Sequence, residues 1–160
     1  MNFIVRPVAE KDLANLESLA SQFSLLNLPA DKKVISEKIE HSISSFAGNE
    51  SLENSSYMFV TEDLENGWVV GSAQIKAQHG SEKNPTYSYK LSKKEMFSKS
   101  LGVGFIHQVL KLKVTVDGPT ELGGLVVHKS YRRRPEKVGK LTSLSRFVYI
   151  GIEPSRFKND

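Results

Sequence analysis

The chain has 160 residues, of which 39% are hydrophobic and 25% charged, and its formal net charge is +4. This composition is typical of a soluble globular protein, and no apolar run approaches the ~20 residues that a membrane-spanning helix needs. There is no cysteine, which excludes disulfides, thiolate catalysis and cysteine-based metal sites and suits the reducing cytoplasm, where we expect the protein. The charged N-terminus around Glu10, Lys11 and Asp12 does not predict a secretory signal.

The first 50 residues predict a strand and two helices. Residues 3–8 are typical of a short strand, in which Pro7 favours an edge position or a bulge. Apolar residues at near-helical spacing predict one helix from about Asp12 and another after Asp31, whose carboxylate is a candidate N-cap. The expected apolar stripes are Leu13, Leu16, Leu19, Ala20 and Phe23 in the first helix and Val34, Ile35, Ile39, Ile43 and Phe46 in the second.

Strands dominate the middle of the chain. Residues 57–61 and 68–76 are predicted as a hairpin, because Asn66-Gly67 tolerates the positive φ angles of a tight turn. Residues 87–91 and 106–116 alternate between apolar and polar side chains, and residues 121–127 form another strand. This order predicts an α/β (α+β) fold with a mostly antiparallel central sheet flanked by helices.

A basic loop then leads into a last helix. From Val138 the pattern is helical, with Leu141, Leu144, Phe147, Val148 and Ile152 on one side. Six Lys or Arg residues and one acidic residue lie between His128 and Lys140, a local excess larger than the net charge of the whole chain. Free amides and the helix dipole attract anions at a helix start, and Gly139 lets a phosphate approach the backbone. The segment therefore predicts an anion site that suits a pyrophosphate.

Residues 134–139, Arg-Pro-Glu-Lys-Val-Gly, are similar to the acyl-CoA loop of the GNAT acyltransferase superfamily, Arg/Gln-x-x-Gly-x-Gly/Ala, with Lys137 in place of the first glycine. Collinear similarities from residue 4 to about 157 resemble the N-terminal half of the arginine N-succinyltransferase family. They include Ile4-Val5-Arg6-Pro7-Val8, Leu28-Pro29-Ala30-Asp31, Tyr57-Met58-Phe59-Val60-Thr61-Glu62-Asp63 and Gly139-Lys140-Leu141.

The resemblance implies a GNAT-like acyltransferase fold over residues 1–160, as one domain that is the N-terminal half of a longer architecture. It implies succinyl-CoA as acyl donor and L-arginine as acceptor. The scattered histidines predict no metal site, and the lack of a long apolar run predicts no membrane partner. The resemblance also implies a homo-oligomer or pairing with a second GNAT-like half through an apolar face or edge. The implied cofactor-binding residues are Leu125, Val126, Val127, Arg134, Val138, Gly139 and Lys140. The family's proposed proton donor, a histidine, lies beyond residue 160, so none of the four histidines here inherits that role and the catalytic residues are unknown.

Two other functions stay open at this stage. One is a stand-alone GNAT N-acetyltransferase acting on another amine. The other is a non-catalytic basic domain that binds nucleic acid or a protein partner, although no aromatic residues interleave with the arginines. Structural roles are also open: Gly123-Gly124 as a strand bulge, Gly139 as relief of helix–sheet crowding, and Arg132–Arg134 as a solvated surface. The expected core includes Leu13, Leu16, Ile39, Ile43, Phe59 and Phe147.

Overall fold

The computed structural model describes residues 2–22 and 28–158, which divide into two compact units. The main unit comprises Met1–Gln78 and Pro119–Asp160, and the hairpin unit comprises His79–Gly118. The main unit contains β1 (Phe3–Pro7), α1 (Leu13–Ser21), α2 (Lys32–Phe46), β2 (Ser56–Asp63), β3 (Trp68–Lys76), β6 (Glu121–Val127) and α3 (Val138–Ile152), with 3₁₀ turns at Glu10–Asp12, Leu52–Asn54, Lys129–Tyr131 and Pro154–Arg156. Among the described helices, none is long and apolar enough to cross a bilayer.

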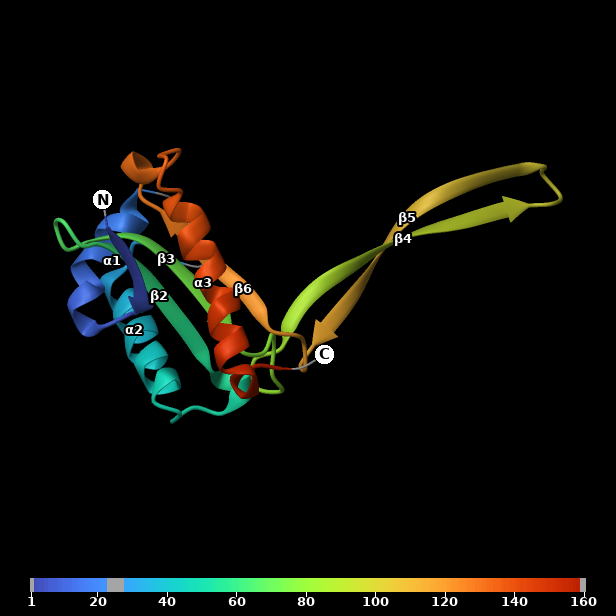
Figure 1. Ribbon diagram of the computed structural model, residues 1–160. Coiled ribbons are helices and arrows are strands. Elements are labelled where there is room, and N and C mark those ends of the chain that lie inside the picture. The colour runs from blue at the N-terminus through green and yellow to red at the C-terminus, as the bar shows by residue number, and fades with distance from the viewer. Residues whose placement is uncertain (1, 23–27, 159–160) are drawn as a thin grey trace. The chain divides into compact units, whose positions relative to one another are not determined.

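The main unit is built on a four-stranded sheet in the order β1-β2-β3-β6, with every neighbouring pair antiparallel. Helices α1 and α2 lie on one face and α3 on the other (Figure 1). Strands β1 and β6 form the two edges, which confirms the edge position that Pro7 predicted. The predicted mixed α/β class with an antiparallel sheet is confirmed.

Alternating residues of β2 supply the core on both faces of this sheet. Met58 and Val60 pack in the cluster that contains α1 and α2 residues such as Leu16 and Ile35. Phe59 points to the opposite face, where the centre of its ring lies 5.2 Å from the centre of the Tyr149 ring in α3. Both faces of the strand are therefore buried, as expected when helices cover a sheet on each side.

Helix α2 begins as predicted but packs differently. The Asp31 carboxylate accepts hydrogen bonds from the backbone N–H groups of Lys33 and Val34, which confirms the N-cap. Ile43, a predicted core residue, is 37% exposed. Ser42 and Ser45 lie on the buried side instead, and their hydroxyls accept from the N–H groups of Met58 and Ser56. The apolar pattern was wrong at Ile43 because these two serines bring the helix against β2. Phe23, placed in the stripe of α1, lies outside the described residues.

Helix α3 departs further from its predicted orientation. Phe147, predicted as core, is 55% exposed, and the other four residues of the predicted apolar side are exposed with it. The side that faces the sheet consists of the buried Val138, Thr142 and Arg146, together with the partly buried Tyr149 and Ile150. The prediction of Phe147 as core was wrong because Thr142, Arg146 and Tyr149 take the sheet-facing positions instead.

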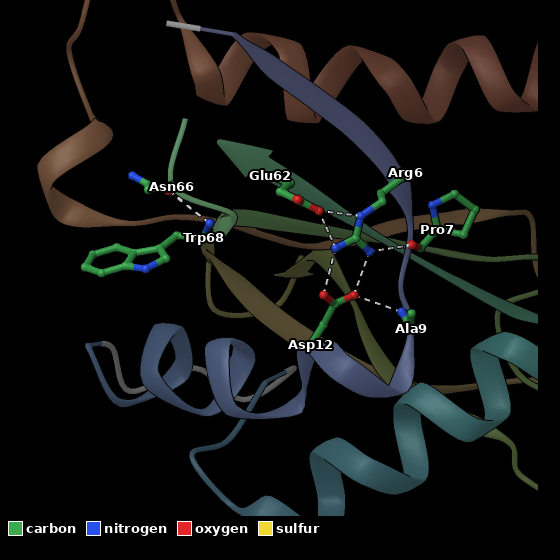
Figure 2. A network of polar contacts seen from close by, with 7 residues as sticks. All are labelled: Arg6, Pro7, Ala9, Asp12, Glu62, Asn66 and Trp68. Carbon is green, nitrogen blue, oxygen red and sulfur yellow. Dashed lines mark hydrogen bonds and ion pairs between the residues drawn. The ribbon is translucent and has the colours of Figure 1, made fainter. Parts of the chain in front are cut away.

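The hairpin between β2 and β3 is confirmed, but its turn is not the tight one expected. Residues 64–67 form a longer loop, closed by a 2.8 Å bond from the Gly67 N–H to the Asp63 carbonyl. Gly67 has a φ of 72°, whereas Asn66 is not among the described residues with positive φ. The Asn66 side chain instead accepts from the Trp68 N–H (Figure 2).

Arg6 links β1 to β2 and to the turn before α1 (Figure 2). Its guanidinium donates to both oxygens of Asp12, at 2.7 and 2.8 Å, and to Glu62 at 2.7 Å. Burial tends to raise the pKa of Asp12, but hydrogen bonds from Arg6 and the Ala9 N–H outweigh it, so the pKa lies below its usual value. The charge of Arg6 is thus balanced by two carboxylates, and these ion pairs hold β1 against β2 and the turn before α1.

The hairpin unit consists of β4 (Thr86–Ser98) and β5 (Val103–Thr115), antiparallel along their whole length. These strands are longer than the predicted 87–91 and 106–116. Large apolar residues form cross-strand pairs on one face: Tyr87 with Val114, Tyr89 with Leu112, and Leu91 with Leu110. All six are at least half exposed within the described chain.

Candidate functional site

The end of β6, the basic loop and the start of α3 line one cavity of about 440 Å³, within the usual range for small-molecule sites. All seven residues predicted as cofactor-binding line it: Leu125, Val126, Val127, Arg134, Val138, Gly139 and Lys140. The remaining lining residues are Tyr131, Arg132, Arg133 and Lys137, so five cationic side chains and no acidic one surround the cavity. The arrangement is suited to an extended anion.

Strand β6 offers mainly its backbone to this cavity. The side chains of Val126 and Val127 are buried in two different core clusters, whereas Leu125 is exposed. Within the described residues β6 pairs only with β3, so its outer edge offers backbone groups to another partner, except that the Val127 carbonyl already accepts from Arg132 Nε at 3.0 Å. An extended ligand with amide groups would complete this edge as a further strand does.

A bulge interrupts β6 beside the cavity. Gln74 faces Gly123 and Ser72 faces Val126, so two residues of β6 oppose the single Ala73 of β3. Gly124 has a φ of 59°, a left-handed conformation that glycine adopts without strain. The bulge predicted as one interpretation of Gly123-Gly124 is confirmed. Such a bulge leaves an unpaired residue, whose backbone groups point away from the regular ladder.

The basic loop is fixed to the sheet through Tyr131. Its hydroxyl donates to the buried Asp63 carboxylate at 2.9 Å, and the guanidinium carbon of Arg134 lies 4.3 Å from the centre of its ring. Bonds to Asp63 from the Glu65 N–H, Tyr131 and Asn66 hold the pKa of Asp63 below its usual value. Tyr131 thus orients Arg134, the arginine of the loop motif. This role leaves no signal in the sequence, because the bond joins residues 68 positions apart.

Lys137 starts α3 in a left-handed conformation, with φ 51° and ψ 45°. It stands where the loop motif has its first glycine, and the structure explains that preference, since a side chain is strained at such angles. The departure at Lys137 was visible in the sequence, but its strain and its place in the cavity were not. Gly139 does not relieve crowding, because a Cβ there would lie at an ordinary 3.6 Å from Val127.

The cavity has no histidine or carboxylate among its lining residues. The Nδ1 atom of His128 accepts from the Ser130 N–H at 3.1 Å. His41, in α2, places its Nε2 atom 4.0 Å from a carboxylate oxygen of Glu50, in the loop that follows α2. Within residues 2–22 and 28–158, no group of three or more His, Asp or Glu side chains is placed to hold a metal ion. The chemistry available at this site is anion binding and backbone hydrogen bonding.

Comparison with protein families gives one match over nearly the whole chain. The sequence model of the family described as "Arginine N-succinyltransferase beta subunit" matches residues 3–160. The arginine N-succinyltransferase of Enterobacter sp. (strain 638) is 33% identical over 156 residues, which are 96% of this chain and 44% of that protein. The Escherichia coli (strain 536) protein of the same name is 32% identical over 158 residues, 98% of this chain and 45% of that one.

Comparison with solved structures also finds a succinyltransferase. The arginine/ornithine succinyltransferase subunit AI from Pseudomonas aeruginosa superimposes with a TM-score of 0.87 and 29% identity, over 98% of this chain and 47% of that one. Glucosamine-6-phosphate N-acetyltransferase from Arabidopsis thaliana shares the fold, with a TM-score of 0.50 and 13% identity over 98% of this chain and 78% of that one. The chain thus has a GNAT-like fold, and it spans slightly less than half the length of the succinyltransferases that it matches.

Proposed function

The chain belongs to the arginine N-succinyltransferase family, and from this premise we propose that it is the acyl-CoA-binding, N-terminal half of an acyltransferase that moves a succinyl group from succinyl-CoA to the α-amine of L-arginine. The observation that supports this most directly is the cationic cavity at β6 and α3, in which all seven expected residues meet. A chain without cysteine needs no oxidising compartment, and we place this function in the cytoplasm.

The donor binds along β6 with its phosphates on the loop. The pyrophosphate lies at the first amides of α3 near Gly139, where Arg134 and Lys140 add positive charge. The pantetheine arm runs beside the open edge of β6 and pairs its amides with the backbone around Leu125. An N–H group at the Gly124 bulge donates to the thioester oxygen as negative charge develops there.

The reaction requires acid–base groups in addition to this binding site. The neutral α-amine of arginine attacks the thioester carbonyl, the carbon–sulfur bond breaks, and CoA leaves as a thiolate that takes up a proton. A base must also remove a proton from the attacking amine. The cavity lining contains no carboxylate or histidine, so we propose that these groups come from the region that the relatives have beyond the matched half.

That region would also cover the exposed side of α3. A groove of about 630 Å³ lies between the sheet residues Val5 and Phe59 and the apolar α3 residues Leu144, Val148 and Ile152. Apolar surface of this kind usually marks an interface. We expect the 160-residue chain on its own to associate with itself through this face, and Leu144→Asp to shift the mass measured by light scattering toward the monomer. A wild-type chain that stays monomeric at high concentration would contradict this proposal.

Calorimetric titration with succinyl-CoA tests the donor site. We expect micromolar binding that Arg134→Ala weakens about tenfold, the usual loss for one charge-assisted contact. Lys33→Ala removes one exposed charge from α2 and should leave the affinity unchanged. The affinity should fall as salt rises in the wild type, and less steeply in Arg134→Ala. Absence of binding to any CoA compound, together with salt-dependent binding of duplex DNA, would overturn the proposal in favour of a nucleic-acid-binding domain.

A further inference from the structure

Arg146 is a nearly buried cation on the sheet-facing side of α3, only 6% exposed. Its Nε donates to the Ser143 carbonyl at 3.2 Å, its Nη2 to the Ser143 hydroxyl at 2.9 Å, and its Nη1 to the Gly123 carbonyl at 3.2 Å. All of these acceptors are neutral. A guanidinium has five N–H groups, so two of them have no acceptor in these bonds.

Arg6, in the same chain, differs from Arg146 in having charged acceptors. Arg6 is more exposed, yet two carboxylates surround it, with Asp12 at 2.7 Å and Glu62 at 2.6 Å. None of the ion pairs found in residues 2–22 and 28–158 includes Arg146. Burial lowers the pKa of Arg146, but arginine stays charged in proteins. A buried charge without a counter-charge is costly, which points to an anion that is supplied when a ligand binds.

Arg146 also lies at the correct depth for the acyl end of the donor. From Gly139 to Arg146 the helix advances about 10 Å, at 1.5 Å per residue. From Val127 to Gly123 the strand advances about 13 Å, at 3.3 Å per residue. A donor with its pyrophosphate at Gly139 and its arm along β6 would therefore run toward the bulge, where Arg146 Nη1 bonds the Gly123 carbonyl. There Gly123 and Gly124 carry no side chains of their own, and the Gln74 side chain lies beside Gly124, about 3 Å from where a Cβ would stand.

We propose that Arg146 binds the terminal carboxylate of the succinyl group and so selects succinyl-CoA over acyl groups without a charge. The inference rests on the proposed function and adds to it the residue that determines acyl specificity. The two remaining N–H groups would donate to the carboxylate, in the planar two-point contact that arginine forms with this group. The bond to the Gly123 carbonyl would hold the guanidinium at the bulge in the absence of ligand.

A purely structural role makes a different prediction. If Arg146 only satisfies the Gly123 carbonyl at the bulge, its loss will weaken every acyl-CoA equally. A role in recognising the carboxylate affects succinyl-CoA alone. Butyryl-CoA is the matched probe, because its acyl group has the same four carbons without the carboxylate.

The experiment compares calorimetric affinities of the 160-residue chain for succinyl-CoA and butyryl-CoA. We expect the wild type to prefer succinyl-CoA about tenfold or more, the usual effect of a charged hydrogen-bonded contact. Arg146→Met should abolish this preference and retain the affinity for butyryl-CoA. Arg156→Met is the control, because Arg156 also donates to backbone carbonyls, those of Ser45 and Phe46, and it should retain the preference.

Three results would overturn the inference, and they are distinguishable. If the wild type binds both compounds equally, the donor site stands and the role of Arg146 fails. If Arg146→Met weakens both compounds by the same factor, the residue has only a structural role. If the wild type binds neither compound, the proposed function fails together with the inference. The wild-type preference also provides a test that does not depend on the variant folding.

Discussion

The two faces of α3 differ from what a surface helix usually presents. The face against the sheet includes the polar Thr142 and Arg146 beside Val138, Tyr149 and Ile150, whereas the outer face exposes large apolar side chains. Helices of soluble proteins normally direct their apolar stripe to the core and their polar residues outward. The polar residues on the inner face each have hydrogen-bond partners, so the sheet tolerates them. The difference teaches that an apolar stripe identifies a surface to be covered, but not whether the same chain covers it.

The same substitution on each face gives the sharpest test of this comparison. Val138 is 1% exposed and packs against Val70, Val127 and Tyr131, so Val138→Ala should lower the free energy of unfolding by about 2 kcal/mol. Val148 is 60% exposed, and Val148→Ala should change it by less than about 0.5 kcal/mol, since alanine also favours the helix. Urea unfolding of both variants measures the difference. Equal losses would show that the outer face is covered in solution.

The buried hydroxyl pair beneath α3 predicts an asymmetric effect. Thr142 donates to the Val138 carbonyl at 2.8 Å, and its oxygen lies 2.6 Å from that of Thr61. Because the single proton of Thr142 is used, Thr61 must be the donor to Thr142. Thr142→Val therefore leaves a buried donor without an acceptor and should cost about 1–2 kcal/mol, whereas Thr61→Val should cost less than about 1 kcal/mol.

The double variant completes this test. Replacing both threonines by valine removes the unsatisfied donor, so its cost should be smaller than the sum of the two single costs. Chemical denaturation of the four proteins gives the coupling energy directly. Additive losses, or a larger cost for Thr61→Val than for Thr142→Val, would show that the hydroxyls do not interact as this geometry requires.

Much of the fold followed from the sequence because local signals and packing agree there. The Asp31 cap, the hairpin from β2 to β3 and the edge position of Pro7 depend on properties of single residues. Ile43 and Phe147 were mispredicted because apolar periodicity does not reveal the partner surface. At Ile43 two serines take the buried positions, and at Phe147 the sheet is met by Thr142, Arg146 and Tyr149.

The candidate site was predictable where its residues are contiguous. The strand, loop and helix start bring the seven predicted residues to one cavity with little help from distant segments. Tyr131 and Arg146 were missed because their roles depend on Asp63 and Gly123, which only the fold brings near. Lys137 was noticed as a departure from a motif, but the cost of its conformation required its φ angle.

Lys137 is the residue just before α3, and substitutions there can distinguish the effect of its backbone conformation from that of its charge. A residue with a side chain costs about 1–2 kcal/mol in the left-handed region. Glycine removes this strain, but it also makes the unfolded chain more flexible, which offsets about half of the stabilisation. Lys137→Gly should therefore raise the free energy of unfolding by about 0.5–1 kcal/mol, whereas Lys137→Ala retains the strain and should leave it nearly unchanged. Both variants lose the same ammonium group, so on the proposed function both should weaken CoA binding by the same factor. A chain that is stabilised and yet binds CoA more weakly would show that the strain at Lys137 is retained for the ligand. If the glycine variant bound CoA as well as the wild type, the lysine would have no part in binding, and its left-handed conformation would be only a cost to the fold.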